Sequence, residues 1–237
     1  ALVVGQPIHQ RADLRQALGL LDRDVRPQRG VVKDPGRDVF VVGVVIRLLE
    51  ILLLGRKRNL AEAKGSAMTS GLRTIVTRTV PDATTFRRSG VTIVAGYVFH
   101  IAMFVAFFLY APHILFIKDL VGLSWPALPT PVIDASAVVS IIAMLAVLIN
   151  RLSNRVMRYL TTFEDIVTWL VTFLPLLTGY LAFHRIGFTA PTLLAIHLLS
   201  VELLLIVFPF TKLMHAFTLI LARWYNGAIS GYRGVQS

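Results

Sequence analysis

The chain has 237 residues, of which 55% are hydrophobic and only 16% are charged, and it contains no cysteine. Soluble domains carry about a quarter charged residues, so this composition excludes an ordinary soluble fold and indicates an all-α integral membrane protein. The lack of thiols excludes disulfides, cysteine-ligated iron–sulfur clusters and covalently attached c-type haem. The net charge of +11 gathers in loops between apolar runs, which indicates membrane topology rather than a nucleic-acid partner.

Residues 1–38 are polar and of mixed charge, and we expect an extramembrane tail there. The first membrane span is expected over residues 39–55. It carries Arg47 and Glu50, whose spacing of three residues allows them to pair on one helix face. Charged residues inside a membrane span usually indicate a functional site. Here a purely structural pair of Arg47 and Glu50 is an equal alternative.

A basic loop at residues 56–90 follows, and its apolar residues share one helical face, which predicts a short helix in the membrane interface (Leu72, Ile75, Val76 and Val80). The second span is expected over residues 91–117. It contains His100 and His113, with Pro112 next to the latter. The third span, over residues 135–150, carries no charge.

Thr162 and Asp165 resemble a capping box at the start of the fourth span, so we interpret Glu164 and Asp165 as structural. This span is expected to run to His184. The fifth is expected from about residue 191 to residue 223, roughly 50 Å of helix, so it must tilt, kink at its internal proline or project from the membrane.

These spans predict a five-helix membrane domain over residues 39–223 and a C-terminal tail over residues 224–237. The connectors at 56–90 and 151–158 are basic, so the positive-inside rule assigns them to the cytoplasm. With five spans, the N-terminus would then lie outside and the C-terminus inside a bacterial or archaeal cytoplasmic membrane.

Two histidines of the fifth span, His197 and His215, are eighteen residues apart, which is about five helical turns. Both would project from one face, roughly 27 Å apart along a continuous helix. Because the second and fifth helices run antiparallel, His100 would meet His215, and His113 would meet His197. Two bis-histidine haems b would result. The alternative is that the histidines are interfacial and in phase by coincidence.

The pattern His197-x11-Pro209-Phe210-Thr211-Lys212-x2-His215 resembles the last core helix of the respiratory nitrate reductase gamma subunit, and Phe99-His100-Ile101 is similar to that family's first ligand. Related membrane cytochromes accompany heterodisulfide reductase and dissimilatory sulfite reductase. The resemblance covers residues 39–223. It implies a haem b subunit that exchanges electrons with quinone, passes them to or from an iron–sulfur partner beside a catalytic subunit, and anchors that complex.

One departure concerns the second helix. Nitrate reductase gamma subunits place its two histidines ten residues apart, and the tenth residue after His100 is Tyr110. His113 is about 140° out of phase with His100 on an ideal helix, and Pro112 offers a kink that corrects this. A protein with a single haem, held by His100 and His215, is therefore the alternative to one with two.

Oxidation of a quinol releases two protons, so an acid or base must lie beside the bound ring. The candidates are Lys118, Asp119, His184 and Glu202, together with His113 if it is not a ligand. His184 is also the reserve ligand, and Glu202 has the alternative of a hydrogen bond to another helix. Lys212 either pairs with a haem propionate or reaches the lipid headgroups.

Two further classes of function remain open. Charges within the spans would suit a transporter or channel component, although the sequence lacks an evident inverted repeat. A structural anchor without haem is the third class. The chain holds no complete site for a terminal reaction, so any enzymatic activity would belong to the assembly, whose iron–sulfur subunit we expect on the cytoplasmic side.

Overall fold

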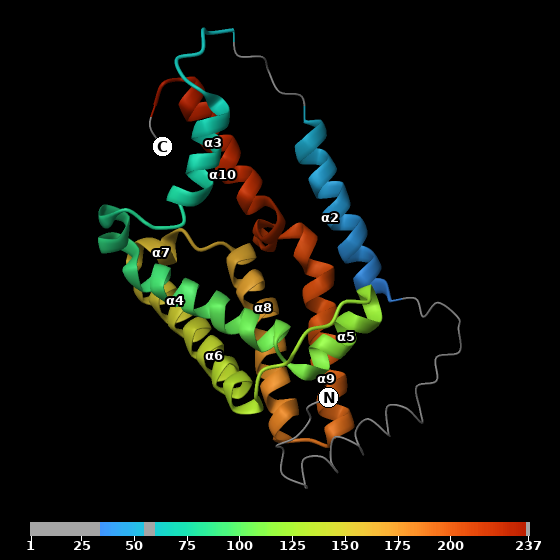
Figure 1. Ribbon diagram of the computed structural model, residues 1–237. Coiled ribbons are helices and arrows are strands. Elements are labelled where there is room, and N and C mark those ends of the chain that lie inside the picture. Colours follow the sequence, from blue (N-terminus) through green and yellow to red (C-terminus); the bar gives the residue numbers. More distant parts are fainter. Residues whose placement is uncertain (1–33, 55–59, 236–237) are drawn as a thin grey trace. The chain divides into compact units, whose positions relative to one another are not determined.

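The computed structural model describes residues 34–54 and 60–235, and over these residues every regular element is helical (Figure 1). From Pro35 onward the described residues belong to one compact unit. The helices are α2 (Pro35–Leu53), α3 (Ala67–Thr77), α4 (Ala83–Phe108), α5 (Ala111–Val121), α6 (Thr130–Ser153), α7 (Arg155–Tyr159), α8 (Phe163–His184), α9 (Ala190–Val207), the short 3-10 helices η1 (Phe208–Phe210) and η2 (Lys212–Met214), and α10 (His215–Tyr232).

Four helical segments of the described chain are long and apolar enough to cross a membrane: Ala83–Phe108, Thr130–Ser153, Phe163–His184 and Ala190–Phe210. The all-α, multi-pass class is therefore confirmed. The expected first span is helical, but α2 is not among these four segments. It carries four charged residues, Arg37, Asp38, Arg47 and Glu50, whereas each of the other four segments carries at most two.

The expected boundaries shift at both ends of the chain. The first 33 residues of the expected tail lie outside the described residues, but residues 35–38 already belong to α2. At the other end α10 continues to Tyr232, so most of the expected C-terminal tail is helical. The basic run at 56–58 also lies outside the described residues.

The membrane helices pack in a few pairs. α4 lies along α6, α6 along α8, α8 along α9, and α2 along α9. The buried core joins Phe99 on α4 to Ala143 and Met144 on α6, and Trp169 on α8 packs against it. Trp169 donates its indole N–H to the Met144 carbonyl, 2.9 Å away. His100 therefore directly follows a residue that is fixed in the core.

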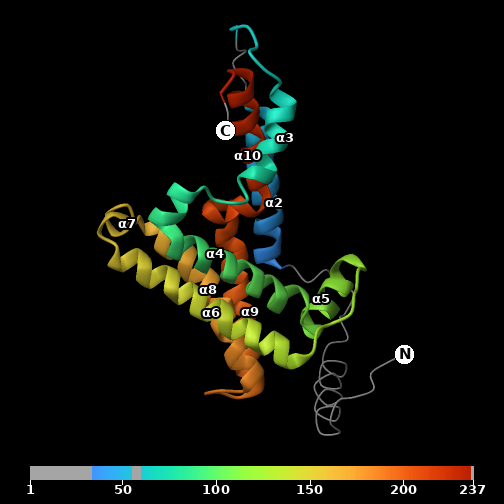
Figure 2. The same ribbon diagram turned by 60° about the vertical axis from the view of Figure 1, so that its left-hand side comes forward.

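Helix α3 confirms the short helix that the basic loop predicted, and it lies along α10 (Figure 2). It does not use its apolar face for this contact, since Leu72 and Val76 are 56% and 71% exposed. The contact between α3 and α10 is made by small residues instead. A Cβ added to Gly227 on α10 would stand 2.2 Å from Thr74 Oγ1 on α3. Pairs of small residues four apart allow two helix backbones to approach closely, and Gly231 continues this row on α10.

The expected second span is not one helix. α4 ends at Phe108 and α5 begins at Ala111, so His113 lies on a separate helix. Pro112 lies in the first turn of α5, where a missing N–H costs no hydrogen bond. The Trp125 indole N–H donates to the Phe108 carbonyl at 2.7 Å and so satisfies a backbone group at the end of α4. The suggested kink is therefore a complete break.

The expected fifth span is also interrupted, and the prediction of one continuous helix is wrong. α9 ends at Val207, Thr211 is extended (φ −128°, ψ 178°) between η1 and η2, and α10 starts at His215. Pro209 lacks an N–H and its ring clashes with the preceding turn, which ends the helix. The argument from five continuous turns between His197 and His215 therefore does not apply.

Candidate functional site: two histidine pairs

Two pairs of histidines meet between helices that are not packed along each other. The rings of His100 on α4 and His215 on α10 have centroids 5.9 Å apart and planes 84° apart. The rings of His113 on α5 and His197 on α9 have centroids 6.4 Å apart and planes 20° apart. These are the pairings expected from two antiparallel helices, although each pair now includes a residue that follows a helix break.

Three of the four imidazoles are oriented by a backbone carbonyl. Nδ1 lies 2.7 Å from the Gly96 oxygen in His100, 2.7 Å from the Lys212 oxygen in His215, and 3.0 Å from the Phe107 oxygen in His113. A carbonyl oxygen can only accept a hydrogen bond, so the neutral ring carries its proton on Nδ1. Nε2 then keeps the lone pair that binds a metal.

His197 is oriented in the same way by a hydroxyl group. Its Nδ1 lies 3.2 Å from Thr178 Oγ1, and that hydroxyl donates its own proton to the Leu174 carbonyl at 2.8 Å. The Thr178 oxygen is therefore available to accept from Nδ1. The ring also lies against Gly179, where an added Cβ would stand 3.1 Å from Cε1. All four imidazoles thus have Nδ1 engaged by a neutral acceptor.

Aromatic side chains flank both pairs. Phe99 and Phe104 lie beside the His100 ring, with centroids at 4.9 and 6.2 Å. Phe107 and Tyr110 lie beside the His113 ring, at 5.2 and 5.1 Å. Such rings present apolar faces and limit the access of water to the imidazoles.

His184, the reserve ligand, lies in a different environment. Its Nε2 is 2.7 Å from Asp134 Oδ1, so the nitrogen that is open in the paired histidines is taken by a carboxylate here. Its ring packs on Tyr180 and Phe183. The structure therefore brings His184 to a partner on α6 and to neither histidine pair.

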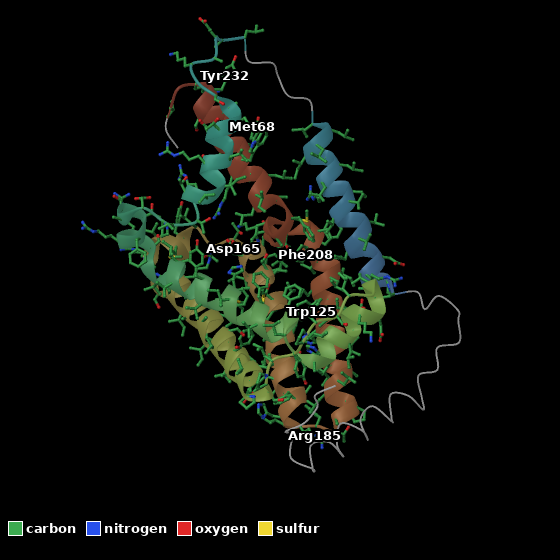
Figure 3. The ribbon with its side chains drawn as sticks, viewed as in Figure 1. Met68, Trp125, Asp165, Arg185, Phe208 and Tyr232 are labelled. Atoms are coloured by element: carbon green, nitrogen blue, oxygen red, sulfur yellow. The ribbon has the colours of Figure 1, made fainter. Side chains whose placement is uncertain are left out.

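The acidic start of α8 holds the segment that leads to His215 (Figure 3). Glu164 Oε1 accepts from the Lys212 backbone N–H at 3.0 Å, and Asp165 Oδ1 lies 2.6 Å from Lys212 Nζ. Asp165 Oδ2 lies 2.8 Å from an Arg151 nitrogen, and only 9% of the Asp165 side chain is exposed. The capping box of Asp165 with Thr162 is confirmed. Lys212 thus pairs with Asp165, a contact that the sequence did not predict.

Helix α2 holds the same segment from another direction. Gly43 lies against Pro209, since an added Cβ would stand 2.6 Å from the Pro209 Cβ. Arg47 donates from Nε to the Pro209 carbonyl at 3.2 Å, and its Nη1 lies 3.0 Å from Glu50 Oε2. The expected Arg47–Glu50 pair is confirmed. A cation here suits the carbonyls that are left open where a helix ends.

The other candidate residues are spread over the fold. Lys118 and Asp119 lie near the end of α5, beyond His113. Glu202 on α9 lies against Gly36 on α2, where an added Cβ would stand 1.7 Å from Glu202 Oε2. Over residues 34–54 and 60–235, no three histidine, cysteine, aspartate or glutamate side chains gather as a metal site.

Sequence reasoning missed how the segment before His215 is held. It assigned the α8 acids to capping alone and the Arg47–Glu50 pair to α2 alone. The sequence did contain a signal for these contacts: one span has a lysine close to a helix-breaking proline, and another span begins with acidic residues.

The chain has a relative in Nitratidesulfovibrio vulgaris strain Hildenborough, which bears the name "Protein". The two sequences are 36% identical over 173 residues, which make up 72% of this chain and 74% of the relative. No family model and no solved structure matches the chain.

Proposed function

We propose that this chain, which belongs to the same family as the Nitratidesulfovibrio vulgaris protein, is the haem b membrane subunit of a respiratory oxidoreductase complex. It would carry electrons between quinone in the membrane and an iron–sulfur partner, and it would anchor that partner and a catalytic subunit. The relative's name states no activity, so the proposal rests on the residues of this chain.

The spacing of the two histidine pairs is the observation that carries the proposal. A metal bound at about 2 Å from the Nε2 atoms of two facing imidazoles separates their ring centroids by about 6 Å. In this structure the ring centroids are 5.9 Å apart for His100 and His215 and 6.4 Å apart for His113 and His197. A porphyrin supplies the remaining four nitrogens to its iron, so a haem site needs no group of three protein ligands.

The environment of the rings also fits this role. Histidines that bind a metal usually donate their other ring N–H to a carbonyl or similar acceptor, which fixes the tautomer and raises the basicity of the ligand. All four imidazoles have such an acceptor, from Gly96, Lys212, Phe107 and Thr178. When bound, haem b would supply reversible one-electron transfer, with a potential set by these ligands and by the exclusion of water.

Two stacked haems would give a route across the membrane. His197 is ten residues from the end of α9, or about 15 Å of helix, and the interrupted segment then leads to His215. The two pairs would therefore lie at different depths. We propose the five-span arrangement, with α2 as the first span, an outer N-terminus and a cytoplasmic C-terminus, so that His100 and His215 lie on the side of the iron–sulfur partner.

Quinone chemistry would take place on the outer side, near His113 and His197. Quinol oxidation needs groups that accept protons and pass them to water. Lys118 and Asp119 follow His113 on α5, and His184 with Asp134 forms a hydrogen-bonded pair at the ends of α8 and α6. We propose these residues for proton release. Glu202 contacts α2 and is the less direct candidate.

The proposal is tested by the absorption spectrum of the purified full chain before and after dithionite. A reduced haem b band is expected, and His215→Ala should lower it by about half because one of two bis-histidine sites loses a ligand. His184→Ala is the matched control and should keep the full band. A wild-type protein without a haem band would overturn the proposal, and an equal loss in His184→Ala would overturn the ligand assignment.

A further inference from the structure

A cavity of about 470 Å³, lined mainly by residues with polar or charged side chains, lies between α3 and α10, away from the histidine pairs. Its lining comes from the C-terminal end of α3, with its capping residue, and from the middle and second half of α10: Thr74, Arg78, Arg223, Asn226, Ile229 and Ser230. Figures 1 and 2 both show these two helices side by side. The row of small residues that includes Gly227 and Gly231 brings the backbones close, so the longer side chains around it border the cavity.

The cavity is lined by two guanidinium groups that lack acidic partners. Arg223 donates to Thr79 Oγ1 at 2.9 Å and to the Ile75 carbonyl at 3.4 Å, both of which are neutral acceptors. Within the described residues, neither Arg223 nor Arg78 forms an ion pair. Two arginines beside a serine hydroxyl and an asparagine amide supply several donors, which suits the oxygens of a phosphate group.

The cavity lies at the edge of the membrane-spanning helices. Arg78 precedes the span that starts at Ala83 by five residues. Within that span Tyr97 donates its hydroxyl proton to the Thr79 carbonyl, so the end of α3 lies beside α4. Two cations in the cavity lining thus lie near a membrane span in the fold, as contact with a lipid headgroup requires.

The opposite face of α3 is apolar and exposed. Leu72 and Val76 lie four residues apart on α3 and are 56% and 71% exposed, and Val80 just beyond it is 75% exposed. A helix with one exposed apolar face and basic residues elsewhere lies in the membrane interface. The cavity on the other side of α3 is therefore placed at the level of lipid headgroups.

We propose that this cavity binds the phosphodiester of an anionic phospholipid, with Arg78 and Arg223 as the principal contacts. The ligand is anionic because two cations without acidic partners favour a headgroup with net negative charge over a zwitterionic one. This inference requires only the membrane location of the chain. It does not depend on haem.

Native mass spectrometry of the delipidated full chain tests the proposal, with dioleoylphosphatidylglycerol as the probe and dioleoylphosphatidylcholine as the comparison. Wild-type protein should retain phosphatidylglycerol about tenfold more strongly than the double variant R78Q/R223Q. The matched control R73Q/R233Q loses the same charge from α3 and from the residue that follows α10, but not from the cavity lining, and should bind as wild type does. R78Q alone should show several-fold weaker binding. The Arg78 side chain donates no hydrogen bond within the described part of the chain, so the R78Q protein should fold as wild type does.

Four results would overturn the proposal. Equal losses in R78Q/R223Q and R73Q/R233Q would show that net charge alone attracts the lipid. Equal retention of phosphatidylcholine would show that the anionic charge is not recognised. Displacement of the lipid by millimolar inorganic phosphate would assign the cavity to a soluble anion. Unchanged lipid binding in R78Q with a reduced haem band would assign the arginines to a cofactor.

Discussion

The break between α4 and α5 and the break between α9 and α10 each place a histidine at the start of the following helix. His113 lies in the first turn of α5, and His215 is the first residue of α10. His113 then meets His197 within α9, and His215 meets His100 within α4. Breaking the helices solves a geometric problem, because thirteen residues on one straight helix would put His100 and His113 on different faces.

The two breaks are held by different forces. Neutral groups hold the first: the Trp125 indole donates to the Phe108 carbonyl, and Leu128 donates its backbone N–H to the Leu109 carbonyl at 3.0 Å. Charges hold the second, through Asp165 with Lys212 and through Arg47 on the Pro209 carbonyl. Charge-neutralising substitutions should therefore disturb the His100–His215 pair and leave the His113–His197 pair unchanged.

Asp165→Asn should have the largest effect. The carboxylate is almost buried between Lys212 and Arg151, and its loss leaves both cations without their partner. Because the Lys212 side chain is 55% exposed and solvent screens its charge, we expect a loss of about 2 kcal/mol in the free energy of unfolding. If the proposed haems are present, the haem at His100 and His215 should decrease while the other one stays. Chemical unfolding and haem spectra measure both, with Asp119→Asn as the control for one lost charge; equal effects in the two variants would contradict the assignment.

Gly43→Ala tests the second break by steric means. The added methyl would stand 2.6 Å from Pro209, so α2 must move away from the break and the Arg47 contact must lengthen. A destabilisation of about 1 to 2 kcal/mol is expected. Gly90→Ala is the matched control, because its nearest atom is 3.9 Å away, and it should be neutral or slightly stabilising. Similar unfolding midpoints for the two variants would show that Gly43 is not tightly packed.

Trp125→Phe addresses the first break. It keeps the ring and removes the N–H that donates to the Phe108 carbonyl, which should cost about 1 kcal/mol. Trp169→Phe removes an equivalent hydrogen bond to the Met144 carbonyl in the core, away from both breaks. Both variants should lose similar stability, but only Trp125→Phe should alter the signal of the haem proposed at His113 and His197. A change in the His100–His215 signal would argue against separate control of the two sites.

Asp82→Asn should have the smallest effect on stability and should not affect either helix break. Hydrogen bonds from the Thr85 hydroxyl and from the backbone N–H groups of Thr85 and Thr84 lower the pKa of the Asp82 carboxyl at the start of α4. A lowered pKa in the folded state stabilises the protein above the pKa of the unfolded state, about 3.9, and this contribution is lost as the pH falls through the folded value. Thermal midpoints of wild type should therefore fall toward those of Asp82→Asn below about pH 4. A constant difference would contradict this cause.

The sequence was sufficient for some features because they depend on local pattern. Apolar runs predicted the membrane helices, Thr162 with Asp165 predicted the cap, and the antiparallel order of the spans predicted which histidines face each other. Whether Pro209 bends a helix or ends it depends on contacts with α2 and α8, which are distant in sequence. The packing face of α3 was also missed, because glycines on α10 favour small residues over an apolar stripe.

Electron paramagnetic resonance of the oxidised, purified protein tests the central claim most directly. The His100–His215 planes lie 84° apart and the His113–His197 planes 20° apart. If each pair held a haem iron with these ring angles, the nearly perpendicular imidazoles would give a highly anisotropic low-spin ferric signal with one large g value, and the nearly parallel ones would give a rhombic signal. We predict both signals in wild type and the loss of the rhombic one in His113→Ala. A protein without any low-spin ferric haem signal would contradict the account.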